Sequence, residues 1–306
     1  APAFRDEDLR ADRVPVHTQI DMEMSFVEPK DVFQVVESYV SAIFKEIKGI
    51  SLTQPFQVMP YDEAIERFGN DKPDLRFAYE LETITELAKT TSFKVFQESP
   101  SVRLLRVEEG SKLSRKHIDA FEKEAKRMGA KGLAWARLKD GTFSGGVAKF
   151  LDHDVWAKSL NLKDDTLLLF VADTYKTASS ALAQVRLKLA DILNLKDPTQ
   201  FKFLWVTDFP LFEKDETTQS YSASHHLFTQ PKKEHLPYLD SNPEKVKGDL
   251  YDMVLNGVEL LSGSIRISDP KIQQKVLDVI QMSREEAQDK FGFLMEAMKY
   301  GAPPHG

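Results

Sequence analysis

Two carboxylates and an arginine lie on one predicted β-hairpin near the end of the chain. Asn256-Gly257 is a strong signal for a tight turn between two strands. Asp252 precedes this turn, and Glu259 and Arg266 follow it. Carboxylate oxygens can hold Mg²⁺ against the phosphates of a nucleotide, and a planar guanidinium can donate two parallel hydrogen bonds to a carboxylate. The alternative for the two acids is a pair of exposed charges at strand ends, and the pattern alone leaves both interpretations open.

A stretch rich in charge opens the chain, and we interpret it as two short strands joined by a long charged loop. Its two parts are Phe4-Arg5-Asp6-Glu7-Asp8-Leu9-Arg10-Ala11-Asp12-Arg13 and Thr18-Gln19-Ile20-Asp21-Met22-Glu23. Side chains alternate between the faces of a strand. Three sets therefore share a face each: Ala3, Arg5 and Glu7; Gln19, Asp21 and Glu23; Ile20, Met22 and Met24. We expect the apolar set to be buried, whereas the polar face either meets water or lines a cleft.

A histidine pair, His225-His226, is the third feature that could do chemistry. Adjacent residues of an extended chain point to opposite sides, so both rings cannot easily bind one metal ion. The sequence offers no third metal-binding residue at a spacing that is typical of a metal site. A histidine pair of this kind is more often a satisfied polar contact than a metal site.

The composition limits the class of protein. The 306 residues suffice for about two domains, and 42% apolar content supports an ordinary core. A net charge of −7 is not typical of a protein held to nucleic acid by bulk electrostatics. Without cysteine, disulfides and thiolate metal sites are excluded. The longest apolar run, residues 167–172, is too short to span a bilayer. Ala1 begins inside a predicted strand without a targeting peptide before it, which suggests an internal fragment.

Hydrophobic periodicity predicts the elements that must position these residues. Helices are expected at 29–48, 61–68, 114–128, 174–195 and 283–300. Strands are expected at 101–107, 132–138, 166–172 and 203–212. From about residue 77 to 196, helices and strands alternate without a cluster of histidines or carboxylates, which predicts a compact α+β unit of its own.

The opening stretch, FRDEDLRADR…TQIDMEMSF, resembles motif 2 of class II aminoacyl-tRNA synthetases, in the form found in bacterial and organellar aspartyl-tRNA synthetases. Three further blocks follow in the order of that family. They are DKPDLR at 71–76, which precedes an inserted domain there, SHHLFT at 224–229, and YDMVLNGVE at 251–259 with the strand up to Arg266. VAKFL at 147–151 is also typical of the inserted domain.

The resemblance implies an α+β fold in which helices flank the antiparallel sheet of class II synthetases. Residues 1–76 would form the first part of the catalytic domain, 77–196 an insertion (GAD-type) domain, and 197–306 the second part. The implied enzyme is an aspartate-tRNA ligase that uses ATP and Mg²⁺ to form aspartyl-adenylate from L-aspartate and passes the acyl group to tRNA(Asp). A cytoplasmic or organellar homodimer away from membranes is expected. Because motif 1, motif 3 and the anticodon-binding barrel of the family are not in the chain, we expect it to be inactive alone.

The resemblance also implies roles for single residues. Arg5 would bridge the α-phosphate of ATP and the substrate carboxylate, as the catalytic residue. The other expected ATP contacts are Asp6, Glu7, Arg13, Val14, His17 and Glu259. The expected aspartate contacts, besides Arg5, are Gln19 and Asp21 at the α-ammonium and His225 and Arg266 at the side chain. Asp252 and Glu259 would bind Mg²⁺.

The chain departs from the family pattern at three places, and two other functions stay open. Val14-Pro15-Val16-His17 stands where the family has Gln-Pro-Glu-Phe, so His17 would replace a phenylalanine stacked on adenine. Leu260-Leu261-Ser262 replaces a glycine run, and Leu227 replaces a proline. One alternative is a fragment that binds tRNA or a partner without catalysis. The other is a class II asparagine synthetase paralogue that activates aspartate, although such paralogues lack the inserted domain. Whether tRNA(Asn) is also charged stays open.

Overall fold

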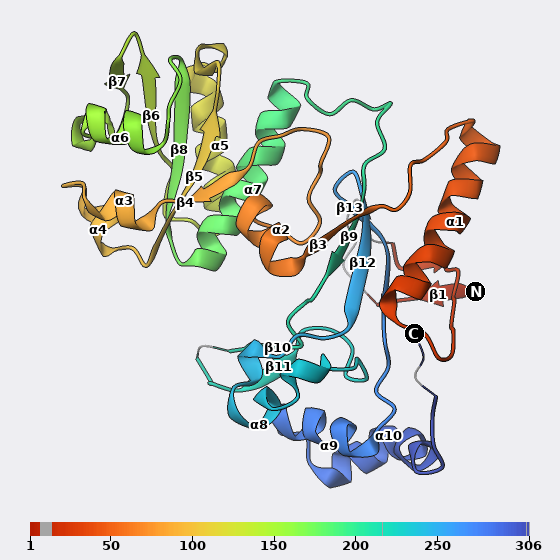
Figure 1. The fold of residues 1–306 in the computed structure, drawn as a ribbon. Coiled ribbons are helices and arrows are strands. Elements are labelled where there is room, and N and C mark those ends of the chain that lie inside the picture. Colours follow the sequence, from red (N-terminus) through yellow and green to blue (C-terminus); the bar gives the residue numbers. More distant parts are fainter. Residues whose placement is uncertain (7–13, 216, 304, 306) are drawn as a thin grey trace. The chain divides into compact units, whose positions relative to one another are not determined.

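The chain folds into two compact units in a computed structural model that describes residues 1–6, 14–215, 217–303 and 305 (Figure 1). Residues Ala1–Tyr61 and Phe203–Gly306 form the first unit, and Asp62–Lys202 form the second. The segment predicted as an inserted domain, 77–196, lies inside the second unit. Its assignment as an insertion (GAD-type) domain stays a prediction.

A four-stranded sheet forms the centre of the first unit (Figure 1). Its strands, in spatial order, are β13 (Val258–Ser264), β12 (Leu250–Leu255), β9 (Phe203–Thr207) and β3 (Gln57–Pro60). All neighbours are antiparallel except β3 and β9, which are parallel. The strand predicted at 203–212 is shorter, because Asp208 adopts a left-handed φ of 61° and ends β9.

The helix α1 (Pro29–Lys48) has the predicted bounds and packs on one face of this sheet. The ring of Phe33 stacks on Trp205 of β9 with 4.1 Å between centroids, and meets Tyr251 of β12 edge-on at 5.0 Å. The indole Nε1 of Trp205 donates to the Glu37 carboxylate at 2.9 Å, which satisfies two buried polar groups inside this contact. By alternation, Asp252 and Val254 of β12 face the opposite side of the sheet.

The remaining elements of the first unit are short strands and helices. They are β1 (Pro2–Phe4), β2 (Val16–Thr18), β10 (Phe212–Lys214), β11 (Tyr221–Ala223), α8 (Tyr238–Ser241), α9 (Pro270–Val279), α10 (Arg284–Met298) and two 3-10 turns at Lys233–His235 and Pro243–Lys245. A small apolar core joins β10 to α8 and α9 through Phe212, Leu239 and Val276. The predicted helix at 283–300 is confirmed as α10, whereas α9 was not predicted.

The second unit is built on an antiparallel sheet of five strands. In spatial order they are β4 (Leu81–Thr83), β5 (Ser101–Val107), β8 (Thr166–Asp173), β6 (Ala134–Lys139) and β7 (Thr142–Ser144). Its helices are α2 (Tyr61–Phe68), α3 (Thr85–Lys89), α4 (Lys94–Glu98), α5 (Arg115–Arg127), α6 (His153–Ser159) and α7 (Tyr175–Ile192), with 3-10 turns at Gly110–Lys112 and Ala148–Phe150. Tyr61 itself belongs to the first unit. The predicted helices and strands here are confirmed to within a few residues.

The central strands of this sheet are buried on both faces. Leu105 and Leu169 pack in one apolar core with α5 and α7, whereas Leu104 and Phe170 pack in a second core with α3, α4 and α6. Alternate residues of each strand therefore fill different cores, which explains why β8 reads as a continuous apolar run. The sheet is the middle of three layers.

Two buried arginines, Arg186 and Arg103, lie inside the second unit, and the first of them holds the segment before β4. Arg186 of α7 donates from Nη2 to the carbonyls of Asp74 and Phe77 at 2.9 and 3.0 Å, and its guanidinium lies 4.0 Å from the centroid of the Phe77 ring. Burial lowers the pKa of Arg186 to about 10. Arg103 of β5 donates to the Ser179 hydroxyl at 2.7 Å. Residues 74–77, predicted to lie at the end of the first catalytic segment and the start of the inserted domain, are thus anchored to α7.

Across the described residues, no helix combines the length and the apolar character that crossing a membrane requires.

Candidate functional site

A β-bulge in the hairpin β12–β13 arranges the predicted acids. Asp252 pairs with Ser262, whereas Val254 pairs with Glu259, and the register shifts between Met253 and Val254. Leu260 is therefore an extra residue on β13. Directly opposite residues share a face of a sheet, so Glu259 lies on the face of Val254, which is also the face of Asp252. The two acids are diagonal neighbours, a relation that separates residues by roughly 7–8 Å.

The same bulge also decides where Arg266 points. Glu259 and Arg266 are an odd number of residues apart, so a regular strand would place them on opposite faces. Ser264 pairs with Leu250, and the extended chain continues to Arg266, whose side chain follows Ser264 by alternation. With one extra residue between them, Glu259 and Arg266 share the face of Asp252. The bulge thus gathers the three predicted chemical residues of the hairpin on one face.

The departure at Leu260 is compatible with this geometry. Leu260 has no positive φ, so leucine adopts the bulge conformation without the strain that would favour glycine. Gly263 is different, because a Cβ added there would lie 2.5 Å from Cε2 of Tyr251. Tyr251 is buried and packs against Phe33 and Trp205, so it cannot move aside.

Replacing Gly263 with alanine is therefore expected to destabilise the first unit by about 1–3 kcal/mol through overpacking against Tyr251. Urea unfolding followed by tryptophan fluorescence measures the change. Gly292→Ala on α10 is the matched control, because the atoms nearest to its new Cβ belong to the amide end of the flexible Gln288 side chain, and alanine favours helix. Equal stability of Gly263→Ala and the parent chain would show that Tyr251 is not fixed as described.

The acid pair has the character of a magnesium site. Asp252 is 6% exposed, and Glu259 is exposed at the edge strand. Mg²⁺ is usually bound by one or two carboxylates, with waters and substrate phosphates completing its shell, so two acids on one face of the hairpin fit this ion. The described part of the chain holds no group of three or more His, Cys, Asp or Glu that could bind a metal alone. The donor set therefore fits a magnesium ion shared with a bound phosphate.

Arg266 contacts the second histidine of the pair. Its Nη1 lies 2.9 Å from Nδ1 of His226, and its backbone N–H donates to the His305 carbonyl at 2.8 Å. Desolvation of the imidazole, together with the positive charge of Arg266, lowers the pKa of His226 from its ordinary value of 6.5. His225 was predicted to contact the side chain of the substrate aspartate. Its ring lies edge-on against Phe209 with 5.0 Å between centroids.

The opening segment forms a strand pair, but the second strand lies earlier in the chain than predicted. It is β2 (Val16–Thr18), and residues 19–24, which were predicted to form it, lie outside any strand. β1 and β2 form a two-stranded ribbon in which Ala3 lies opposite His17, and the Arg5 N–H donates to the Pro15 carbonyl at 2.8 Å. Arg5 and His17 thus share a face by alternation. Asp6 and Val14 are exposed at the ends of the described segments, and the predicted contacts Glu7 and Arg13 lie outside the described residues.

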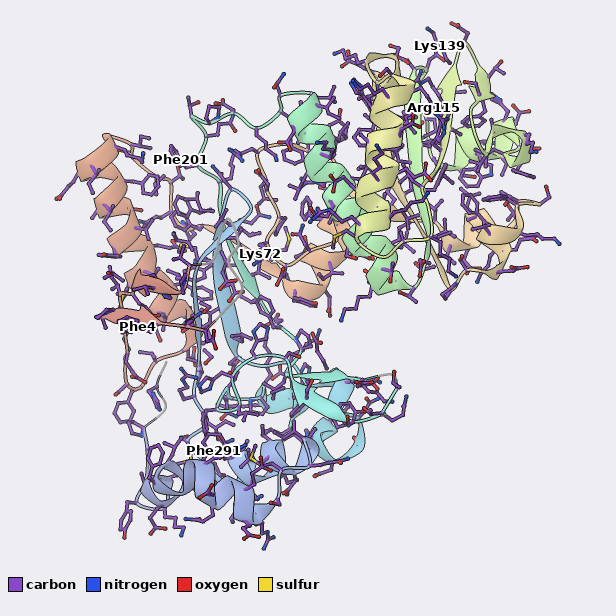
Figure 2. The ribbon with its side chains drawn as sticks, turned by 180° about the vertical axis from the view of Figure 1, so that it is seen from behind. Phe4, Lys72, Arg115, Lys139, Phe201 and Phe291 are labelled. Atoms are coloured by element: carbon purple, nitrogen blue, oxygen red, sulfur yellow. The ribbon has the colours of Figure 1, made fainter. Side chains whose placement is uncertain are left out.

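The prediction that an apolar face of the second strand is buried is wrong. β2 ends at Thr18, and Ile20 and Met22 are 66% and 41% exposed. Phe4, on the other face of the ribbon from Arg5, is 75% exposed (Figure 2). Among the described residues the ribbon has two strands, which is too few to build a layer over an apolar face.

Two polar side-chain contacts lie in the segment after this ribbon, and the second of them involves a residue bonded to the backbone of Arg266. The Gln19 side-chain amide donates to the Asp21 carboxylate. Nδ1 of His305 lies 2.7 Å from the Glu23 carboxylate, and the backbone of His305 accepts from Arg266. The pair Glu23–His305 was not predicted. The sequence analysis grouped Glu23 with Gln19 and Asp21 on a polar face, which was a signal for Glu23, but its partner His305 is far away in the sequence.

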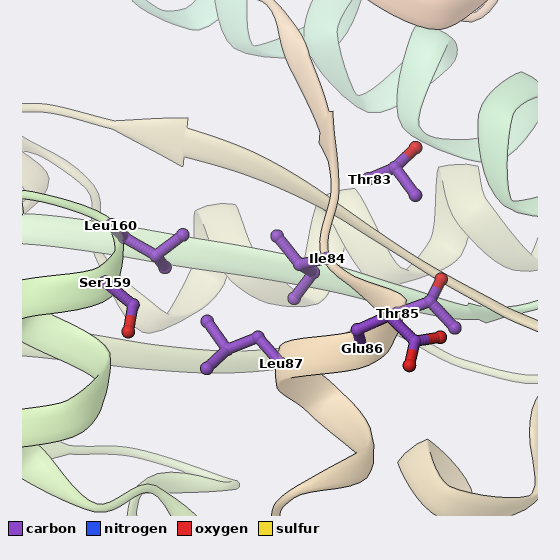
Figure 3. Close-up of a pocket in the computed structure, with 7 residues that line it drawn as sticks. All are labelled: Thr83, Ile84, Thr85, Glu86, Leu87, Ser159 and Leu160. Carbon is purple, nitrogen blue, oxygen red and sulfur yellow. The ribbon is translucent and has the colours of Figure 1, made fainter.

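A cavity of 460 Å³ in the second unit lies between the start of α3 and the end of α6 (Figure 3). Its lining comprises Thr83, Ile84, Thr85, Glu86, Leu87, Ser159 and Leu160. The Thr85 hydroxyl already accepts a hydrogen bond from the Val102 N–H at 3.0 Å. None of the predicted site residues lines this cavity.

Comparison with known proteins places the chain among tRNA synthetases. It is 48% identical to the aspartate–tRNA ligases of Macrococcus caseolyticus and Ruminiclostridium cellulolyticum, over 99% and 100% of its length and 52% and 53% of theirs. It is 46% identical to the aspartate–tRNA(Asp/Asn) ligase of a Geobacillus species, over all of its length and 53% of that protein. The chain thus spans about half the length of the curated relatives it matches.

A solved structure of the aspartyl tRNA synthetase from Entamoeba histolytica aligns with 99% of the chain and 40% of its own, at 15% identity and a TM-score of 0.42. A family model described as tRNA synthetases class II (D, K and N) matches residues 1–306. The predicted α+β class agrees with the mixed helices and mostly antiparallel sheets. The chain belongs to the class II tRNA synthetases of the D, K and N group.

Proposed function

We propose that the chain is the aspartate-activating part of an aspartate-tRNA ligase. The observation that carries the proposal is the bulged hairpin, which places Asp252, Glu259 and Arg266 on one face. The family membership and the names of the relatives support aspartate as the amino acid. The proposed setting is protein synthesis in the cytoplasm or an organellar matrix, by a homodimer.

The proposed reaction has two steps. A carboxylate oxygen of the aspartate α-carboxyl group attacks the α-phosphorus of ATP, the bond to the bridging oxygen breaks, and pyrophosphate leaves. A ribose hydroxyl at the 3′ end of tRNA then attacks the acyl carbon of aspartyl-adenylate, and AMP leaves with the electron pair of the broken bond. Neither step needs a nucleophile from the protein. The protein must align the reactants and stabilise the charge that builds on the α-phosphate.

The residues divide this work by charge. Arg5 is proposed to contact the α-phosphate and the reacting carboxylate, whereas Asp21, which accepts from Gln19, would bind the α-ammonium of aspartate. Arg266 would bind the side-chain carboxylate through parallel hydrogen bonds.

The nucleotide would be held by the remaining predicted contacts. Asp252 and Glu259 would hold Mg²⁺, which when bound neutralises charge on the ATP phosphates. His17, on the face of Arg5, is proposed to stack on the adenine, where its smaller ring replaces the phenylalanine of relatives. Glu7 and Arg13 remain proposed ATP contacts from the sequence.

Aspartate-dependent exchange of pyrophosphate into ATP tests the first step, with the complete product of the gene that encodes the chain. We expect exchange with L-aspartate and none with L-asparagine or L-lysine. Acylation of tRNA(Asp) tests the second step, and tRNA(Asn) in a parallel assay shows whether the enzyme resembles its relative named for both tRNAs. Exchange without acylation of either tRNA would favour an asparagine synthetase paralogue. Absence of exchange in a folded protein would favour a protein that binds tRNA or a partner without catalysis.

A further inference from the structure

His305 and Thr229 contact the backbone of Arg266, and His226 contacts its side chain. The N–H of Arg266 donates to the His305 carbonyl at 2.8 Å, and Arg266 forms an isolated β-bridge with Thr229. These contacts fix its backbone but leave a long side chain with many rotamers. The guanidinium has only donors, so it needs an acceptor to settle in one orientation. His226 supplies that acceptor through Nδ1, at 2.9 Å from Nη1.

The acceptor is a neutral imidazole. The backbone N–H of Phe228 also donates to Nδ1 of His226, at 3.2 Å. A main-chain N–H and a guanidinium are both obligate donors, so Nδ1 carries a lone pair and the ring proton sits on Nε2. The lowered pKa of His226 agrees with this neutral tautomer.

The loop that carries His226 is itself fixed by packing. Gln273 of α9 is fully buried and donates from Nε2 to the Leu227 carbonyl at 3.0 Å. The ring of Phe228 meets Phe291 of α10 edge-on, with 5.1 Å between centroids. An acceptor on a loop with two such anchors can orient an arginine without moving with it.

A neutral acceptor has a consequence that an acidic one would lack. A carboxylate beside Arg266 would cancel its charge and compete with an anionic ligand for the same N–H groups. An imidazole occupies one N–H and leaves the positive charge and the remaining donors available. We propose that His226 is a positioning residue for Arg266, which it holds in the orientation that binds the side-chain carboxylate of aspartate. This inference rests on the proposed function.

Pyrophosphate exchange with the complete gene product tests the inference through the KM values for L-aspartate and ATP. His226→Leu removes the acceptor but keeps a similar volume, and we expect the KM for aspartate to rise at least about 10-fold, the loss typical of a hydrogen bond to a charged group. The KM for ATP is expected to stay within about twofold. His226→Asn places an amide oxygen where Nδ1 was, and we expect it to restore the KM for aspartate to within about threefold.

A pH profile gives a readout that a merely structural role would not change. Protonation of His226 turns Nδ1 into a donor facing Arg266 and the Phe228 N–H, so the KM for aspartate is expected to rise as the pH falls from about 7.5 to 5.5. The other titratable groups near this contact are His225, which precedes His226, and the pair Glu23–His305 beside the Arg266 backbone. Tyr251, Asp252 and Glu259 of the hairpin also carry ionisable groups near Arg266. All of these groups remain in His226→Asn, where the rise is expected to disappear if His226 is its source.

His117→Asn in α5 is the matched control, because its Nδ1 accepts only from the Ser114 N–H at a helix start in the second unit. We expect it to change neither KM. Equal losses for ATP and aspartate in His226→Leu, or no rescue by asparagine, would overturn the positioning role. Exchange by the parent enzyme with an unchanged aspartate KM in His226→Leu overturns this inference alone. Absence of aspartate-dependent exchange in the parent enzyme overturns the proposed function and the inference with it.

Discussion

Replacing Arg266 with lysine is expected to weaken binding of L-aspartate by between about 10-fold and 100-fold. A change of this size corresponds to the loss of one hydrogen bond between charged groups. Lysine keeps the positive charge but loses the planar fork that can bind both oxygens of a carboxylate. It also loses the Nη1 contact to His226, so the ammonium is free to adopt other rotamers. Affinity for ATP is expected to change by less than about threefold, because Arg266 is assigned to the amino acid alone.

Isothermal titration of the complete gene product with each ligand measures both effects. Arg284→Lys, an exposed arginine in the first turn of α10, is the matched control and should leave both affinities unchanged. A loss of the same size for aspartate and ATP would contradict the assignment of Arg266 as the reader of the aspartate side chain. Retained aspartate affinity would show that a point charge suffices and that the fork is not used.

The helices were the part of the fold that the sequence predicted best. α1 and α2 have the predicted bounds because apolar residues recur with helical spacing and Gly49 and Gly69 end the pattern with positive φ. The helix α9 was missed although a local signal exists. Asp269 is its N-cap and accepts from the Lys271 N–H, and Pro270 follows at the first helical position.

The face of each hairpin residue could not be predicted from alternation alone. The turn at Asn256-Gly257 pairs Leu255 with Val258, whereas residues farther from the turn pair in a register that differs by one. The two registers meet at Leu260, and no glycine or proline stands at that position to mark the bulge. Alternation therefore related Ser264 to Arg266 correctly but could not relate Glu259 to either.

Contacts between residues that are far apart in the sequence were the second feature that the sequence could not predict. The expectation that His225 and His226 point to opposite sides could not tell which of them contacts Arg266, and the structure shows that it is His226. Glu23 and His305 lie almost at opposite ends of the chain, and their pairing follows only from the way residues 23–25 run beside the last described residues. Such pairings are properties of the tertiary fold, and a periodic pattern carries no information about them.

Replacing Asp252 with asparagine is expected to lower the rate of pyrophosphate exchange by at least about 100-fold. A bound metal ion stabilises the charge of a transition state by several kcal/mol, and weaker binding of the ion loses part of that stabilisation. Asparagine has nearly the same shape, so the pairing with Ser262 and Val206 is retained. It removes one negative charge from the acid pair, and a neutral amide oxygen is a weaker ligand for Mg²⁺. The Mg²⁺ concentration that gives half-maximal exchange should rise about 10-fold or more.

Titrating the exchange rate with MgCl₂ at saturating ATP and aspartate measures both quantities. Asp278→Asn on α9 is the control, since Asp278 is an exposed acid whose carboxylate accepts from Gln274 on its own helix. Glu259→Gln should shift the Mg²⁺ dependence in the same direction as Asp252→Asn, because the bulge places both acids on one face. If Asp252→Asn alone changed the Mg²⁺ dependence, the two acids would not share an ion, and Glu259 would be a charge at the edge of the sheet. Unchanged affinity for aspartate in both variants would separate the metal site from the contact at Arg266, which alternation places on the same face.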